Sequence, residues 1–518
     1  MAKMHITDKN NREREFKEEE KMLKVKEYNF WFVTGSQDLY GEEALEQVAK
    51  DSQKIVEGLN SKEDIKFNII HKPTVRNSKE IFDICNAANN DEDCAGIITW
   101  MHTFSPAKMW IRGLSILNKP QLHFHTQFNR DIPWETMDMD FMNLNQSAHG
   151  DREFGFINTR MENKRKVLVG HWEDEAVHKD INKWMSVAAA YVEGFNIKIA
   201  RFDDNMRNVA VTEGDKVEVA IKLGWTCDAF GIGDLVEEVE KVTQEEVEEL
   251  LKVYEEKYEI CEEGQVEGEV RDSIKYQAKV EIALRRFLEK GGYTAFTTNF
   301  QVLHGMEQLP GLAVQRLMED GYGFGGEGDW KTAGLVRLMK IMSNNVGTSF
   351  MEDYTYHFEP GNELILGAHM LEVCPTVAAD KPRIDVKPLS IGDKKDPARL
   401  IFNGQAGKAV CASLVDLGGR MRLIVNEVNA KEVEKELPNL PVARVVWTPE
   451  PSLKVGAQAW ILAGGAHHTS FSYVVDAEQL CDLSDMYGLE AVVIGKDTNI
   501  RDFSNELKWN SVYWMLRK

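Results

Sequence analysis

Residues 28–41 read YNFWFVTGSQDLYG, an apolar run that breaks into a Gly-Ser-Gln turn. The stretch that follows, residues 44–60, spaces its apolar side chains as an amphipathic helix does. A buried strand, a turn and a helix form the repeating unit of a parallel sheet, because each strand needs a crossover before the next can run in the same direction. These residues therefore predict an α/β fold that begins near residue 28.

The same alternation continues through the first half of the chain. It predicts a strand at 94–104, a helix at 105–117, a strand at 120–128, and a second α/β block that starts near 167–172 and 197–205. The turns at residues 35–41, 102–106 and 125–129 are expected on one edge of a sheet, because parallel sheets bind ligands at the carboxyl ends of their strands. Residues 234–259, rich in Glu and Lys, are predicted to form one long helix with a solvated face.

After about residue 346 the pattern changes from α/β to mostly β. Residues 353–373 alternate around a Pro-Gly-Asn turn and predict a β-hairpin, and short strands with glycine turns follow. The pattern predicts two α/β domains followed by a mostly-β domain, either a barrel or a sandwich. The predicted boundaries are a charged extension at 1–24, an N-terminal α/β domain at 25–197, a central α/β domain at 198–345 and a β-rich domain at 346–518.

Composition excludes several classes of function. The 518 residues carry a formal net charge of -22, which argues against nucleic acid or an anionic membrane as a partner. Seven cysteines occur without a CxxC pair, as expected for reduced thiols of a cytoplasmic protein. The sequence contains no apolar stretch long enough to predict a membrane span. We expect a soluble cytoplasmic protein.

The stretch GYGFGG at residues 321–326 matches the glycine pattern of dinucleotide-binding loops. Such a loop must follow a strand and open a helix. Here the preceding residues, 309–320, have helical periodicity, and Gly321 is a natural helix stop. We therefore reject nicotinamide binding and expect the glycines to let residues 326–331, GEGDWK, present their carboxylates.

Two carboxylates and two imidazoles of the second half stand in distinctive settings. They are Glu327, Glu352, His369 and His468. A mixed oxygen and nitrogen set without a thiolate suits an open site for manganese, cobalt or magnesium better than a structural zinc site. The four residues are far apart in sequence, however, and from composition alone surface acids and packed histidines remain the favoured explanation.

A resemblance to a known family adds what spacing alone does not give. The sequence resembles the L-arabinose isomerase family from about residue 28 to its end. The motifs that carry the resemblance are GSQDLYG, HTFSPAKMW, HTQFN, MDFMNLNQSAHG, DNMR, QLPGLAVQRLM, GEGDWKTA, SFMEDYTYHF, GAHMLEVCP and ILAGGAHHT. The charged leader and the stretch TTNFQVLHG depart from the family pattern.

The resemblance implies two Rossmann-like α/β domains followed by a mostly-β barrel domain, and it implies a site and its cofactor. The implied ligands of one manganese(II) per subunit, with cobalt or magnesium as possible substitutes, are Glu327, Glu352, His369 and His468. The implied substrate residues are Gln37, Tyr40, Phe104, Gln146, His149, Met206, Thr297 and Phe300. His468 is taken as the ligand because the family's histidine directly precedes a threonine. Alternation along a strand then predicts that His467 points away from the site.

The implied reaction is an intramolecular oxidation and reduction that converts L-arabinose to L-ribulose and D-galactose to D-tagatose. Glu327 and Glu352 are the implied acid and base of a metal-assisted proton transfer through an enediolate, with their roles unassigned and a hydride shift as the open alternative. A homo-oligomer is implied, a hexamer with active sites shared between subunits. Two other functions remain: a non-catalytic sugar-binding protein, which needs no metal ligands, and an isomerase of fucose or another aldose.

Overall fold

Both faces of the first strand are buried, which explains its uninterrupted apolar sequence. The computed structural model of the chain describes residues 22–389, 391, 393–435 and 437–516. Within it, β1 (Asn29–Gly35) sends Phe30 and Phe32 into one apolar core and Trp31 and Val33 into another. Successive strand residues point to opposite faces, so one strand serves both cores. Most of the predicted charged extension, residues 1–24, lies outside the described residues.

Contacts divide the chain into two units. The N-terminal unit comprises Lys26–Glu193 and Cys481–Tyr487, and the larger unit holds the remaining described residues. The chain thus returns to the N-terminal unit for seven residues near its end. The three predicted domain boundaries stay a prediction.

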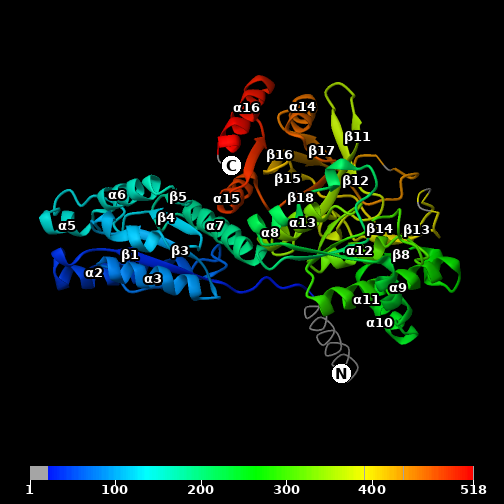
Figure 1. The fold of residues 1–518 in the computed structure, drawn as a ribbon, viewed down its shortest axis with the longest axis horizontal. Helices are drawn as coiled ribbons and strands as arrows, with labels where there is room; N and C mark the ends of the chain where they lie inside the picture. Colours follow the sequence, from blue (N-terminus) through cyan, green and yellow to red (C-terminus); the bar gives the residue numbers. More distant parts are fainter. Residues whose placement is uncertain (1–21, 390, 392, 436, 517–518) are drawn as a thin grey trace. The chain divides into compact units, whose positions relative to one another are not determined.

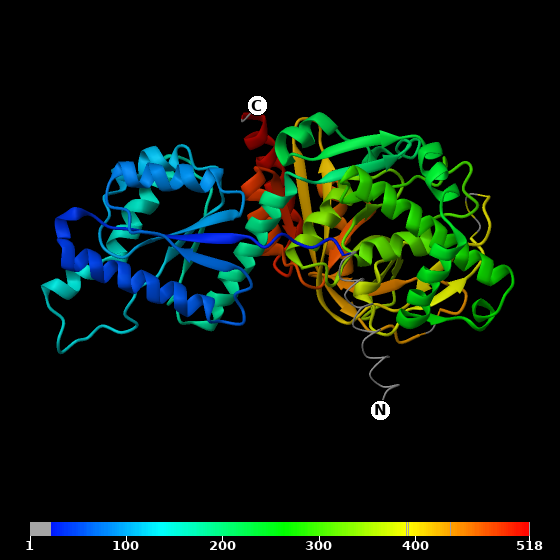
Figure 2. The same cartoon turned by 90° about the horizontal axis from the view of Figure 1, so that it is seen from below.

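The N-terminal unit is a parallel five-stranded sheet with the strand order β2-β1-β3-β4-β5. Helices lie on both sides of this sheet (Figures 1 and 2). One core packs α2 and α7 against the sheet, and the other packs α3, α4 and α6 against the opposite face. Its elements are β1, η1 (Asp38–Tyr40), α2 (Glu42–Asn60), β2 (Asn68–His71), α3 (Ser78–Asn90), β3 (Cys94–Met101), η2 (Ala107–Trp110), α4 (Ile111–Leu114), β4 (Gln121–His125), α5 (Met139–Leu144), α6 (Ser147–Arg160), β5 (Lys166–Val169) and α7 (Glu175–Gly194).

The first part of the larger unit is a second α/β layer. Its parallel sheet has the order β10-β9-β6-β7. Its elements are β6 (Lys198–Phe202), η3 (Ala210–Thr212), α8 (Lys216–Leu223), β7 (Thr226–Phe230), α9 (Ile232–Glu240), α10 (Gln244–Lys257), β8 (Glu259–Ile260), η4 (Glu262–Gln265), α11 (Glu269–Gly291), β9 (Ala295–Thr297), α12 (Gly311–Glu319), β10 (Gly323–Gly325) and α13 (Trp330–Met342). Every residue of α13 is buried, so this helix forms a fixed base for the loop before it.

The rest of the larger unit is mostly β, as predicted. A seven-stranded sheet has the order β15-β18-β11-β12-β17-β16-β19, and a further pairing of β15 with β16 closes six of its strands into a barrel. The elements are β11 (Thr348–His357), β12 (Leu364–Ala368), η5 (Pro375–Val377), β13 (Arg383–Val386), β14 (Ala398–Ile401), β15 (Gly407–Asp416), β16 (Met421–Lys431), β17 (Arg444–Pro449), α14 (Leu453–Ala463), β18 (His468–Ser472), α15 (Ala477–Tyr487), β19 (Glu490–Ile494) and α16 (Ile500–Leu516). The predicted hairpin is the β11–β12 pair.

The predicted long helix at 234–259 is wrong, because the chain starts a new helix inside it. Thr243 caps α10 by accepting from the Glu246 amide, and the Glu246 side chain accepts in return from the Thr243 amide. This reciprocal capping box is a helix start signal, so α9 ends before it. The helix predicted before GYGFGG is present as α12, and Gly321, which follows its end, has a positive φ of 100°.

None of the helices in the described residues is both long enough and apolar enough to cross a membrane.

Candidate functional site

The turn between β10 and α13 presents Glu327. Its φ is 58°, a left-handed backbone conformation that is uncommon for a residue with a side chain. The neighbouring loops hold this turn in place. The Met206 amide donates to the Glu327 carbonyl oxygen at 2.9 Å, and the Gly328 amide donates to the Thr298 carbonyl oxygen at 3.1 Å. The carboxylate of Glu327 is therefore directed by a turn that main-chain bonds fix on both sides.

Strand pairing explains how the other three candidates meet. Glu352 lies on β11, between the two strands that carry or precede the histidines. It pairs with His468, the first residue of β18, on one side and with Ala368, the last residue of β12, on the other. His369 follows Ala368 directly. Residues more than 100 positions apart in sequence are thereby brought together by antiparallel register, which no local motif encodes.

The four predicted ligands converge in the larger unit. One ligand atom from each of Glu327, His369 and His468 lies within 4.8 Å of the others. The Oε2 atom of Glu327 is 3.9 Å from Nε2 of His468, and Oε2 of Glu352 is 3.9 Å from Nε2 of His369. Both histidines are buried, with exposed fractions of 6% and 0%. This arrangement offers one carboxylate and two imidazoles to one point, with the Glu352 carboxylate beside His369.

The outer contacts of the two histidines fit a metal at that point. Nδ1 of His369 lies 2.5 Å from Oε2 of Glu372, and Nδ1 of His468 lies 3.2 Å from Oδ2 of Asp329. Metal-binding histidines commonly use their second nitrogen in this way, which orients the ring. Nε2 of His468 is buried and has no hydrogen-bond partner among the described residues. A buried nitrogen without a hydrogen-bond partner, 3.9 Å from a carboxylate oxygen of Glu327, fits the position of a metal ligand.

Neighbouring groups shift the pKa values of three side chains at this site. The His467 side chain, as a hydrogen-bond donor, lowers the pKa of Glu327 against the opposing effect of burial. Burial would raise the pKa of Asp329, but Lys331 and His468 outweigh it and the net shift is downward. Burial disfavours a charged His369, yet the Glu372 carboxylate raises its pKa overall. Glu327 and Asp329 are therefore held ionised.

The prediction that His467 points away from the site is wrong. Its Nε2 atom lies 3.6 Å from Oε2 of Glu327, and its ring centroid is 4.3 Å from that of His468. The reason is that β18 begins at His468, so strand alternation does not govern the residue before it. The helix α14 precedes the Gly-Gly turn where a strand was expected.

Sequence reasoning missed Asp329 and Glu372 as partners of the histidines. Asp329 is also the N-cap of α13, where its side chain accepts from the Thr332 amide. That role has a sequence signal, an Asp directly before a helical run. Glu372 stands three residues after His369, but no helix lies there. Only the fold reveals that contact.

Five predicted substrate residues gather within the N-terminal unit. The side-chain amide of Gln37 donates from Nε2 to the Phe104 carbonyl oxygen at 3.0 Å, and the Tyr40 hydroxyl donates to Oε1 of Gln146 at 3.4 Å. The rings of Phe104 and His149 stack with centroids 4.5 Å apart. The turn after β1, the turn after β3 and the start of α6 therefore meet at the carboxyl edge of the sheet, as the strand order predicts.

The three other predicted substrate residues lie in the larger unit. Met206 is tied to the Glu327 turn through its amide. Thr297 is fully buried, and its hydroxyl donates to the Gly325 carbonyl oxygen at 2.6 Å. Phe300 is half-buried against the apolar core. Among these, Met206 lies beside the carboxylate turn, whereas the Thr297 hydroxyl is already engaged in holding β10.

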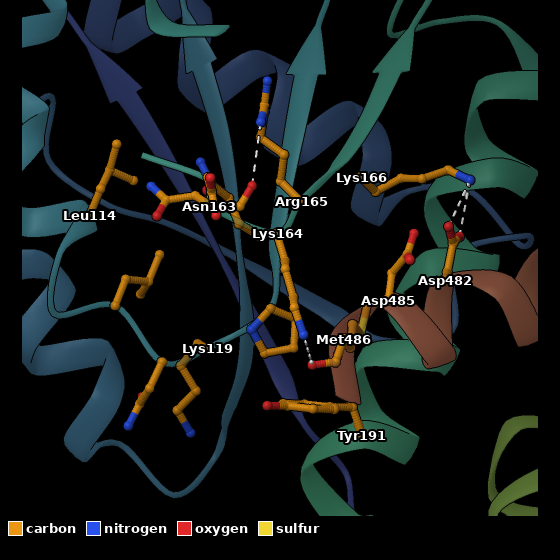
Figure 3. A pocket seen from close by; sticks show the side chains of 15 residues that line it. Leu114, Lys119, Asn163, Lys164, Arg165, Lys166, Tyr191, Asp482, Asp485 and Met486 are labelled. Carbon is orange, nitrogen blue, oxygen red and sulfur yellow. Dashed lines mark hydrogen bonds and ion pairs between the residues drawn. The ribbon is translucent and has the colours of Figure 1, made fainter. Parts of the chain in front are cut away.

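A surface pocket of the N-terminal unit contains none of the predicted site residues. It has a volume of about 270 Å³ and lies where β4 and β5 begin, against the second half of α15 (Figure 3). Lys166 pairs with Asp482 at 3.0 Å, and the Lys164 amine donates to the Met486 carbonyl oxygen at 3.5 Å. Ligands of parallel sheets bind at the opposite edge. We assign these contacts to the attachment of residues 481–487.

Comparisons with known proteins identify relatives along almost the whole chain. Family models of the L-arabinose isomerase N-terminal, central and C-terminal domains match residues 24–196, 198–345 and 347–490. An L-arabinose isomerase of Geobacillus stearothermophilus is 63% identical over 493 residues, which are 95% of this chain and 99% of the relative. The Bacillus subtilis (strain 168) enzyme of the same name is 62% identical over 497 residues, 96% of this chain and 100% of the relative. The corresponding Clostridium beijerinckii protein is 61% identical over 493 residues, 95% and 100% of the two chains.

Proposed function

The chain belongs to the L-arabinose isomerase family, and on this premise we propose that it converts L-arabinose to L-ribulose. One observation carries the proposal from the residues upward: Glu327, His369 and His468 bring ligand atoms within 4.8 Å of one another, and Glu352 lies beside His369. A sugar-binding protein without catalysis has no use for such a set. The convergence therefore favours an enzyme over a binding module.

We propose Glu327, Glu352, His369 and His468 as ligands of one manganese(II) ion, with cobalt or magnesium as substitutes. When bound, such an ion supplies positive charge that favours negative charge on neighbouring sugar oxygens. Glu372 and Asp329 orient the two imidazoles so that each presents Nε2 to the site. The carboxylates complete a mixed oxygen and nitrogen set of the kind that these ions accept.

The isomerisation moves a proton between C1 and C2 of the open-chain sugar through an enediolate. Glu327 and Glu352 are the proposed acid and base, because each places a carboxylate oxygen beside the histidines. One carboxylate takes the proton from C2, and the other transfers protons at the sugar oxygens O1 and O2. Proton transfer by positioned side chains typically contributes about 10²–10⁴-fold in rate. Burial of both histidines restricts water around the reacting carbons.

The remaining predicted residues contribute binding. Gln37, Tyr40, Gln146 and His149 offer polar groups suited to sugar hydroxyls, and Phe104 stacks against the His149 ring. Since D-galactose has the same configuration at its reacting end, we propose slower conversion of D-galactose to D-tagatose as well. An isomerase of fucose remains the second candidate on fold alone, and a panel of aldoses separates the two.

We propose a homo-oligomer, a hexamer, in which the N-terminal unit of one subunit serves the metal centre of another. The support is that the predicted ligands all lie in the larger unit, whereas five substrate residues lie in the N-terminal unit. We place the enzyme in the cytoplasm, because all seven cysteines are free thiols.

The decisive experiment is an assay of L-ribulose formation from L-arabinose. Enzyme stripped with a chelator is expected to be inactive and to recover when manganese is added back. Apo enzyme that isomerises at the full rate would overturn the metal centre. A metal-loaded enzyme that acts on fucose but not on arabinose would favour the second candidate.

A further inference from the structure

The N-terminal unit holds a buried carboxylate that the proposed reaction does not use. Asp151 lies on α6 two residues after His149, and it is 2% exposed. Its Oδ1 atom accepts from the Met101 amide at 3.2 Å and lies 3.0 Å from Nε2 of His123. Its Oδ2 atom lies 2.8 Å from Nδ1 of His125. One carboxylate therefore ties α6 to the ends of both β3 and β4.

The strand pattern explains why two histidines reach this carboxylate. His123 and His125 stand two residues apart on β4, so their side chains share one face of the sheet. The residue between them, Phe124, points into the opposite apolar core. A buried carboxylate is costly unless its oxygens are hydrogen-bonded, and here three donors from two strands satisfy it.

Other contacts hold the first turn of α6 close to the same strands. A Cβ atom at Gly150 would come within 2.6 Å of the Thr103 carbonyl oxygen. The Gln146 amide donates to the His102 carbonyl oxygen at 2.9 Å, and the indole of Trp100 donates to the Ser147 hydroxyl at 3.2 Å. The start of the helix thus has little room to shift while Asp151 keeps its partners.

The close packing of α6 on β3 and β4 determines the positions of two polar side chains that are exposed or half-buried. Gln146 directly precedes α6, and His149 lies in its first turn, where its ring stacks on Phe104. We propose that Asp151 is a positioning residue for sugar recognition, which fixes α6 on β3 and β4 so that Gln146 and His149 meet the substrate. This inference rests on the proposed function, in which those two side chains contact the sugar.

The first test is Asp151→Asn, which keeps the size of the side chain but removes the charge and one acceptor. We expect the KM for L-arabinose to rise about tenfold, the loss of roughly one sugar hydrogen bond, with kcat within about twofold. A purely structural role would lower the melting temperature and leave the KM unchanged. Glu193→Gln is the matched control, because it makes the same acid-to-amide change at a carboxylate bonded to Tyr28 in the same unit.

A second variant keeps the inference testable if Asp151→Asn does not fold. Gly150→Ala leaves every titratable group in place but drives a methyl group against the Thr103 carbonyl oxygen, which displaces the start of α6. It is expected to raise the KM in the same manner. The Glu193→Gln control is expected to keep the wild-type KM.

Specific results overturn the inference. A folded Asp151→Asn with unchanged KM contradicts it, and so does a fall in kcat without a change in KM. If only Gly150→Ala folds, an unchanged KM there contradicts it. Failure of the proposed function is distinguishable, because the wild-type enzyme would then form no L-ribulose at all.

Discussion

Glu327 combines an unusual backbone conformation with a carboxylate aimed at two histidines. A left-handed φ at a residue with a side chain costs about 1 kcal/mol or more, and such strain persists where surrounding contacts hold it. Here the bonds from Met206 and Gly328 and the buried helix α13 hold the turn. Backbone strain of this kind clusters at functional sites, so the turn itself supports a chemical role for the carboxylate.

Replacing each carboxylate by its amide tests the acid and base roles. Glu327→Gln and Glu352→Gln keep shape and an oxygen but cannot exchange a proton at neutral pH. We expect each manganese-loaded variant to lose about 100-fold or more in kcat. Glu363→Gln, an exposed change beyond the hairpin turn, is the control and is expected to keep the wild-type rate. A near-normal kcat in a metal-loaded variant would show that the substituted residue is only a ligand or a scaffold and takes no part in proton transfer.

The two adjacent histidines are expected to differ in metal binding. His468 is buried with an orphan Nε2, whereas the His467 side chain is 39% exposed and contacts Glu327. His468→Ala is therefore expected to lose bound manganese, while His467→Ala weakens binding by no more than about tenfold through the reoriented carboxylate. Metal content after gel filtration measures both, with the exposed His357→Ala as control. Equal loss in the two variants would contradict the assignment.

At the scale of residues, the sequence indicated which residue types could form the site but not that they lie close together in the fold. Glu327, Glu352, His369 and His468 were assigned as one set through a family resemblance, because the β12-β11-β18 pairing joins the last three and Glu327 reaches them from the turn before α13. His467 was misjudged since its strand begins one residue later than expected. Asp329 had a signal as a helix cap, but its contact with His468 depends on the register of a distant strand.

At the scale of elements, local capping decided one outcome that periodicity missed. Residues 234–259 have a continuous charged pattern, yet the Thr243–Glu246 capping box divides them into α9 and α10. The period of apolar residues is the same on both sides of the break, so only the cap marks it. The α12 stop at Gly321 was predictable, because a positive φ there favours glycine.

A buried ion pair between α11 and the end of α12 gives a pH-dependent prediction. Oδ2 of Asp320 lies 2.5 Å from Nη2 of Arg285, and the charge of Arg316 also acts on Asp320. Burial would raise the pKa of Asp320, but the two arginines outweigh it and lower the pKa. Because the folded-state pKa is below the unfolded value of about 3.9, this carboxylate stabilises the folded protein above that pH. The contribution is lost as the pH falls through the folded-state pKa.

Asp320→Asn is therefore expected to lower the melting temperature most at neutral pH. Removing one carboxylate of this buried network leaves Arg285 and Arg316 with Glu281 and Glu319 as their remaining acidic partners and costs about 3 kcal/mol. The gap between wild type and variant is expected to narrow as the pH falls below about 4. Scanning calorimetry at several pH values measures it. Glu267→Gln, which breaks an exposed pair with Lys275, is the control and is expected to change little. A gap that stays constant down to acid pH would contradict the prediction.

At the scale of the whole molecule, the alternation of strands and helices was enough to predict the fold class. The positions at which the apolar periodicity changes indicate two α/β regions followed by a mostly-β C-terminal region. Closure of the barrel was less accessible, because it depends on the pairing of β15 with β16 and on strands separated by helices. Long-range pairing carries no local pattern.

Complementation tests whether sites are shared between subunits. His149→Ala chains, which are expected to bind L-arabinose weakly, and Glu327→Gln chains, which are expected to have a low kcat, are unfolded, mixed, refolded together and assayed at low L-arabinose concentration. If one chain's N-terminal unit serves another chain's metal centre, some sites in mixed oligomers contain neither substitution and activity partly returns. Each variant refolded alone is the control and is expected to keep its own low rate at that L-arabinose concentration. Mixed oligomers, verified by co-purification of two tags, that show no gain over these rates would place both residues in one chain's site.

The division of α15 between the two units has a consequence for protein synthesis. A chain leaves the ribosome from its N-terminus, so Lys26–Glu193 is available to fold early. The ion pair of Lys166 with Asp482 and the bond from the Tyr487 hydroxyl to the Tyr191 carbonyl oxygen form only after Cys481–Tyr487 has emerged. The first unit to begin folding is therefore among the last to be completed.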